Sequence, residues 1–190
     1  MALAIHDKVF TAEYQSVIKK RIDLMKENSD PMTGLIPHEY MDEDEFRLEA
    51  RGSSQSLILS HLYEIDPKLG QEYFAAYKEY FLDYRLGLPG IREYRKGVSR
   101  FGDVDSGPVI WGIGGSASVV GVRALGLYGE TTAYKGMRNS LQGFGCGYRL
   151  FGEKRYIFGQ LPMADAFIAW SNSINCRVSQ EADTWWRLKF

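Results

Sequence analysis

The stretch REYRKGVSRFGDVDSGPVIWGIGGSASVVGV, residues 92–122, sets the interpretation of the whole chain. It passes from a loop dense in charged residues into a segment almost without charge. Pro108 follows Ser106 and Gly107, and proline is favoured at the first position of a helix, with Ser or Asp just ahead of it as the N-cap. The pattern predicts a buried helix over residues 108–128, whose N-terminus faces a loop that carries Asp103 and Asp105.

Apolar residues at helical spacing predict further helices on both sides of this stretch. Asp66 and Pro67 mark the clearest start, as an N-cap followed by proline at the first helical position. Residues 151–160 are expected to form a turn or a short hairpin, and residues 181–190 a short last helix. The predicted helices cover residues 10–28, 53–65, 67–82, 108–128, 132–150 and 162–175.

The predicted fold class is all-α, because no long strand pattern competes with these helices. The connections are short, which indicates antiparallel neighbours. The 190 residues are interpreted as a single helical domain covering residues 1–190.

Two stretches, TGLIPHEY…RGSSQSL (residues 33–57) and GDVDSGPVIWGIGGSA (residues 102–117), together with the helix order, resemble the α/α-toroid enzymes. In that superfamily, inner and outer helices alternate around a ring, and the loops at one end form the active site. Glycoside hydrolases, polysaccharide lyases, sugar epimerases and linalool dehydratase/isomerase share the architecture. The resemblance implies a partial toroid here, since a complete ring has about twelve helices and fewer are predicted. The chain is then a fragment of a longer protein, a partial ring, or a protomer completed by a partner.

Composition excludes several classes of partner. The formal net charge of −1 gives no reason to expect nucleic acid or an anionic membrane surface. The least charged stretch, residues 107–122, is too short to span a bilayer. No signal peptide is recognised at the N-terminus, and the compartment stays open. No metal or cofactor is expected, because Cys146 and Cys176 have no metal-ligand spacing and the GIGGSA run follows no strand.

Asp103 and Asp105 are the first candidates for catalysis. They lie two apart, so in an extended loop their side chains point the same way, toward the positive end of the predicted helix. One would act as general base or nucleophile, and a second carboxyl, Glu93 or Glu49, as general acid. The structural alternative is that both aspartates only cap the helix and fix the loop.

A second set of residues is predicted to bind the substrate. Guanidinium groups can clamp a carboxylate or phosphate through two hydrogen bonds, although an internal salt bridge is the simpler role for each arginine. The loop histidine and its neighbouring tyrosine would supply an acid/base pair, unless the histidine is incidental. The predicted substrate-binding residues are Arg51, Arg92, His38, Tyr40, Tyr94 and Trp111.

The sequence therefore predicts a carbohydrate-active enzyme domain, hydrolase-like or lyase-like, that uses carboxylate acid/base chemistry on a saccharide or similar small molecule. The alternative is a non-catalytic helical interaction module, or a half-ring that assembles into a homo-oligomer through its open apolar face. An isomerase or lyase acting on an apolar substrate is a third option that the aromatic content, 14% of residues, allows.

Overall fold

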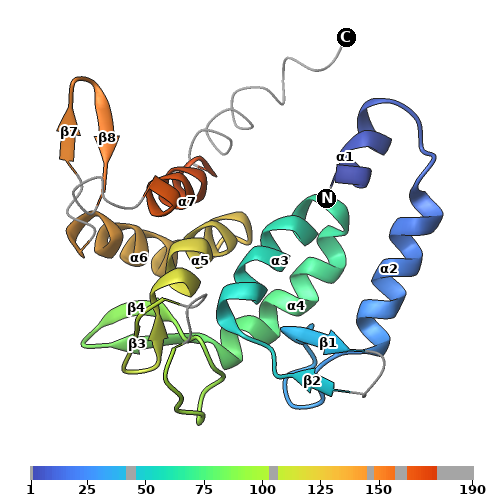
Figure 1. Cartoon of the computed structure of the whole chain (residues 1–190), viewed down its shortest axis with the longest axis horizontal. Helices are drawn as coiled ribbons and strands as arrows, with labels where there is room; N and C mark the ends of the chain where they lie inside the picture. Colours follow the sequence, from blue (N-terminus) through green and yellow to red (C-terminus); the bar gives the residue numbers. More distant parts are fainter. Residues whose placement is uncertain (1, 42–45, 103–106, 145–147, 157–161, 175–190) are drawn as a thin grey trace.

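Helices and short hairpins alternate along the chain (Figure 1). The structure, a computed structural model, describes residues 2–41, 46–102, 107–144, 148–156 and 162–174. Within these ranges it has seven helices and four separate two-stranded antiparallel sheets. The all-α prediction was therefore wrong, although helices form most of the described chain.

The helices are α1 (Ala2–Val9), α2 (Gln15–Glu27), α3 (Gly52–Ile65), α4 (Pro67–Tyr80), α5 (Gly115–Leu127), α6 (Thr131–Phe144) and α7 (Pro162–Asn172). The hairpins pair β1 (Glu39–Met41) with β2 (Phe46–Leu48), β3 (Leu82–Arg85) with β4 (Leu88–Ile91), β5 (Val109–Ile110) with β6 (Ile113–Gly114), and β7 (Tyr148–Leu150) with β8 (Glu153–Arg155).

Three hairpins turn through a large residue followed by glycine, both with positive φ. These pairs are Leu86-Gly87, Trp111-Gly112 and Phe151-Gly152. Two consecutive residues of this kind form the tight turn whose twist matches that of paired strands. The predicted helix over residues 108–128 therefore begins only at Gly115, because β5 and β6 occupy its first residues. The helix predicted over residues 132–150 ends at Phe144, and the hairpin expected further on starts at Tyr148.

The start of α4 confirms its predicted capping. The Asp66 side chain accepts a hydrogen bond from the Leu69 backbone N–H at 3.0 Å, and Pro67 opens the helix. This arrangement satisfies one of the amide groups that have no partner within a helix. The Asp66-Pro67 pair in the sequence therefore located this helix start correctly.

Helix α5 packs against both α3 and α7. Helix α4 packs against α3, and α6 packs against α5. Their apolar core contains Leu35, Ala50, Leu59, Phe74, Tyr77, Phe81, Leu82, Ile91, Ala117, Val122, Ala124, Leu125, Ala133, Tyr134, Met137 and Ile174. Gly121 allows α5 to approach its neighbours closely, because a Cβ there would lie 2.5 Å from Ile91 Cγ1 and 3.0 Å from the Tyr77 hydroxyl. Seven residues of α5 are buried, so it is held by burial on several sides.

The α1–α2 pair lies to one side of this core (Figure 1). The predicted amphipathic helix exists as α2, yet none of its residues is buried. None of the described helices is both long and apolar enough to cross a bilayer, in agreement with the sequence.

Candidate functional site

Residues 91–94, which begin with the last residue of β4, form a buried segment between the start of α3 and the β5–β6 hairpin. The backbone of Glu93 joins these two elements. Its carbonyl accepts a hydrogen bond from the Gly52 N–H at 2.8 Å, and its own N–H donates to the Gly112 carbonyl at 3.1 Å. A Cβ on Gly52 would overlap the Arg92 carbonyl oxygen, so only glycine fits at the first position of α3.

The Glu93 carboxylate is fully buried, with 0% exposure. Its Oε1 accepts a hydrogen bond from the Ser53 hydroxyl at 2.8 Å. A Cβ on Gly114 would lie 3.0 Å from Glu93 Oε2, so glycine at this N-cap of α5 leaves room for the carboxylate. The predicted acid is thus placed between the starts of two helices, where the helix dipoles favour negative charge.

Arg92 faces the protein interior. Its guanidinium donates to Asp83 Oδ2 at 3.1 Å, to the Tyr94 carbonyl at 3.1 Å and to the Val98 carbonyl at 2.8 Å. A Cβ on Gly112 would come within 2.6 Å of the same guanidinium. These contacts give Arg92 a role in shaping the loop after β4, which is the simpler of the two roles considered for it.

Asp83 is the charge partner of that guanidinium. Burial raises the pKa of its carboxyl, but the Tyr84 N–H, the Arg92 hydrogen bond and the charges of Arg85 and Arg92 outweigh burial. The net result is a pKa below the usual value, so Asp83 stays ionised. The loop is consequently held by a charged pair at neutral pH.

Arg51 and Tyr94, both predicted to bind substrate, are in contact. The Arg51 guanidinium lies 5.4 Å from the centre of the Tyr94 ring, and that of Arg100 lies 5.6 Å from it. Arg100 also donates to Glu49 Oε1 at 3.2 Å. The Tyr94 hydroxyl donates to the Phe101 carbonyl at 3.2 Å. Arginine, tyrosine and carboxylate side chains therefore surround the N-terminal end of α3.

His38 belongs to the same end. Its Nδ1 lies 2.9 Å from the hydroxyl of Ser54 in the first turn of α3, a hydrogen bond whose direction depends on the imidazole tautomer. Tyr40 lies in β1, opposite Arg47. The prediction that His38 and Tyr40 form an acid/base pair is not tested by these contacts.

Asp103 and Asp105 lie outside the described residues, but the residues that flank them are placed. Phe101, on one side, is bonded through its carbonyl to Tyr94. Gly107, on the other side, is close to the first turn of α5, where its Cβ would lie 3.3 Å from the Ser116 hydroxyl. Phe101 is therefore held close to the segment that carries Glu93, and Gly107 lies next to the first turn of α5.

Trp111 stands apart from these side chains. It occupies the turn of the β5–β6 hairpin with a φ of 52°, and its side chain is 66% exposed. Its carbonyl accepts a hydrogen bond from Arg85 Nε at 3.3 Å. The described structure gives its indole no place among the other predicted binding residues.

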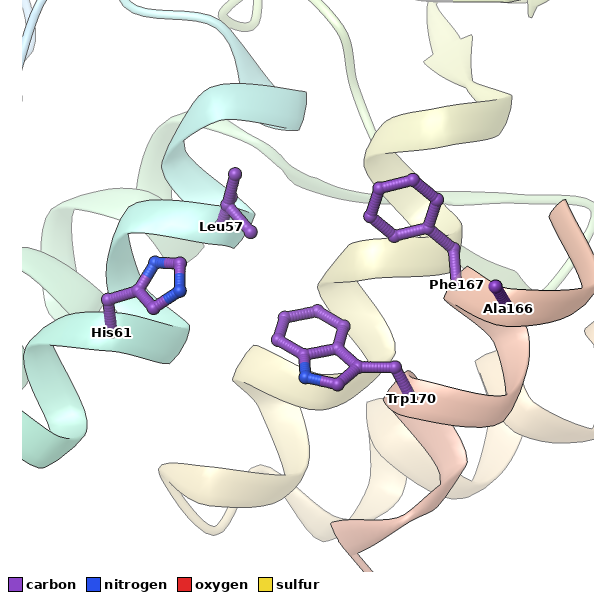
Figure 2. A pocket seen from close by; sticks show the side chains of 5 residues that line it. All are labelled: Leu57, His61, Ala166, Phe167 and Trp170. Carbon is purple, nitrogen blue, oxygen red and sulfur yellow. The ribbon is translucent and has the colours of Figure 1, made fainter. Parts of the chain in front are cut away.

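A second feature escaped the sequence analysis. An open groove of about 350 Å³ lies between α3 and α7, lined by Leu57, His61, Ala166, Phe167 and Trp170 (Figure 2). The apolar members were assigned to helix stripes expected to be core. His61, a polar ring on such a stripe, was the available signal.

Within the described ranges, no cluster of three or more His, Cys, Asp or Glu side chains is arranged to hold a metal ion. No family model matches the sequence, and no curated protein matches it. The resemblance to the toroid enzymes accordingly stays a prediction, and the side chains themselves must carry any functional argument.

Proposed function

We propose that the chain is an enzyme domain that acts on a carbohydrate-like, polyhydroxylated substrate by carboxylate acid/base chemistry. The observation that carries this proposal is the convergence at the starts of α3 and α5. Glu93 is buried there beside Ser53, Phe101 is bonded to Tyr94, and Gly107 lies next to the first turn of α5. Glycosidic bond cleavage requires carboxyl groups, and the sequence offers Asp103 and Asp105 between Phe101 and Gly107.

The roles of the described residues follow from burial and contacts, and those of Asp103 and Asp105 from the sequence. Asp103 or Asp105 carries the reaction as base or nucleophile. Glu93, with no exposed surface, acts through Ser53 and through the backbone that it joins, and so positions the site. Arg51 and His38 supply charge and hydrogen bonds to a polar substrate at the start of α3.

The test is turnover of a panel of polysaccharides and aryl glycosides, read as reducing ends for hydrolysis and as ultraviolet absorbance for elimination. Asp105→Asn is expected to abolish turnover with the helical circular dichroism unchanged, and Glu93→Gln to reduce it by about 10²-fold or more. Asp23→Asn, an exposed carboxylate on α2, is the control. Wild-type rates in the Asp105 variant, or no turnover of any glycoside by the wild type, would contradict the proposal.

A second candidate is an interaction module, and α2 favours it. Val17 and Leu24 are 44% and 43% exposed on a helix that has no buried residue. An amphipathic helix normally buries its apolar stripe. A second copy of the chain is one surface that would cover it.

Light scattering coupled to gel filtration tests this candidate. A dimer is expected for the wild type and a monomer for Val17→Glu. Lys19→Glu, at an exposed position on the opposite side of α2 from Val17 and Leu24, should leave the dimer intact. A monomeric wild type at high protein concentration would exclude self-association through this helix.

A further inference from the structure

We infer that the groove between α3 and α7 binds a neutral aromatic group carrying one hydrogen-bond donor, as the apolar part of the substrate. The inference rests on the proposed function for the substrate's orientation, but the groove itself is argued independently. Its volume of about 350 Å³ falls within the range of small-molecule sites, roughly 300–1,000 Å³.

The lining determines the ligand's polarity. Of the five lining side chains that belong to the described residues, four are apolar and none is a carboxylate, lysine or arginine. Leu57 and Phe167 are 39% and 40% exposed, so apolar surface faces the groove and is still accessible. A charged group entering it would lose water with no opposite charge in the lining to compensate. The occupant is therefore neutral.

The aromatic side chains determine its shape. Phe167 and Trp170 lie with their ring centres 6.5 Å apart and their planes at 83°, an edge-to-face pair. Figure 2 shows both rings pointing from α7 toward Leu57 and His61 on α3. Two rings at right angles form a corner in which a flat ring can stack on one and meet the edge of the other.

Arg123 of α5 holds this corner in place. Its guanidinium lies 4.6 Å from the centre of the Trp170 ring, and its Nη1 donates to the Trp170 carbonyl and to the Ser173 hydroxyl, both at 3.1 Å. Arg123 is itself buried, so these bonds form away from water. The groove is consequently pre-formed, and a ligand need not order its wall.

Among the described lining residues, His61 supplies the polar group. Burial, followed by nearby positive charge that includes Arg123, lowers the pKa of its imidazole, so the ring is neutral at pH 7. In a neutral imidazole one ring nitrogen carries a proton and the other is an acceptor. A hydroxyl or N–H on the aromatic group matches this acceptor.

Two of the lining residues lie on the same face of α3 as Ser53. Ser53, Leu57 and His61 are spaced four residues apart, so they share one face of the helix, with about 6 Å between successive positions. Ser53 is bonded to Glu93. A substrate whose polar part is held at Ser53 would therefore extend its apolar part past Leu57 into the groove, as an aryl glycoside would.

Calorimetric titration of the full chain with 2-naphthol tests the groove. Saturable one-to-one binding is expected, with binding of 2-methoxynaphthalene, which lacks the donor, about fivefold weaker. His61→Leu should remove that preference. Ala166→Trp, which fills the groove, should weaken 2-naphthol binding at least tenfold, and Phe167→Ala should weaken it too. Ala169→Trp, at an exposed position of α7 outside the lining, is the matched control.

The outcomes distinguish a failure of the groove as a binding site from a failure of the proposed enzymatic function. Three results would overturn the groove as a ligand site. They are the absence of saturable 2-naphthol binding, wild-type affinity for 2-naphthol in the Ala166→Trp variant, and dissociation of a dimer by that substitution. Glu93→Gln should bind 2-naphthol normally, since Glu93 is not in the lining. Competitive inhibition of aryl glycoside turnover by 2-naphthol is expected, and its absence would overturn the orientation of the substrate. Failure of the proposed function alone would leave 2-naphthol binding intact.

Discussion

Helices α2 and α5 differ in burial, and only α5 is buried as its sequence predicts. The first has a clear apolar stripe and buries none of its residues, whereas the second has weak amphipathic character and buries seven. An apolar stripe predicts that a helix will form, but it does not say what covers the stripe. The core around α5 and the α1–α2 pair should therefore respond very differently to the same substitutions.

Phenylalanine truncation should give the largest contrast between the two regions. Phe74 is 1% exposed and stacks on Tyr128 with ring centres 4.6 Å apart, so Phe74→Ala should lower the free energy of unfolding by about 3–5 kcal/mol. Phe10 is 74% exposed, and Phe10→Ala should change it by less than about 0.5 kcal/mol. Urea denaturation followed by circular dichroism measures both. Equal losses would show that the N-terminal pair shares the core's stability.

Glycine substitution should give a smaller contrast, now between two helices of the packed region. Gly121→Ala should cost about 1–3 kcal/mol, because the new methyl would lie 2.5 Å from Ile91 Cγ1. Gly143→Ala in α6 meets nothing within 4 Å and should stabilise the helix by up to about 1 kcal/mol. The same denaturation experiment compares them. A stabilised Gly121 variant would mean that α3, α4 and α5 pack less closely than described.

Acidification should have the smallest of these effects on the free energy of unfolding, through His61 on the groove side of α3. The pKa of His61 is lowered from 6.5, so the unfolded chain binds more protons than the folded one below about pH 6.5. The stability associated with the neutral ring is present above that pH and falls as the pH falls through the folded pKa. His61→Asn should therefore flatten the loss of stability on acidification. Parallel pH profiles for the two proteins would refute this assignment.

Predictions from the sequence were most accurate for features that depend only on neighbouring residues. Asp66 and Pro67 located the start of α4 to the residue, because a cap and a fixed φ act within one turn. Three of the four hairpins were missed, and the fourth was expected a few residues too late, because strands of two to four residues leave too short a pattern. The glycine after Leu86, Trp111 or Phe151 marks the turn in three of them. Residues 109–114, which form β5 and β6, and residues 148–150, which form β7, were instead predicted as helix.

The candidate site was predicted only in part, for a related reason. His38, Arg51, Glu93 and Tyr94 meet near the start of α3, but Arg92 turns inward to Asp83 and Trp111 points to solvent. Residue type does not distinguish an arginine that closes a loop from one that holds a ligand. The groove needs the packing of α3 against α5 and of α5 against α7, which no single stretch of sequence contains.

The two backbone hydrogen bonds of Glu93 have a consequence for how the chain acquires its structure. Its carbonyl and amide connect residues that lie far before and well after it in sequence, at Gly52 and Gly112. Each bond closes a long loop, whose entropy must be lost before the contact is gained. During synthesis the helices can form as they emerge, but this junction cannot close until Gly112 has left the ribosome. The residues around Gly112, which are synthesised last, thus complete the surroundings of those around Gly52, which are synthesised first.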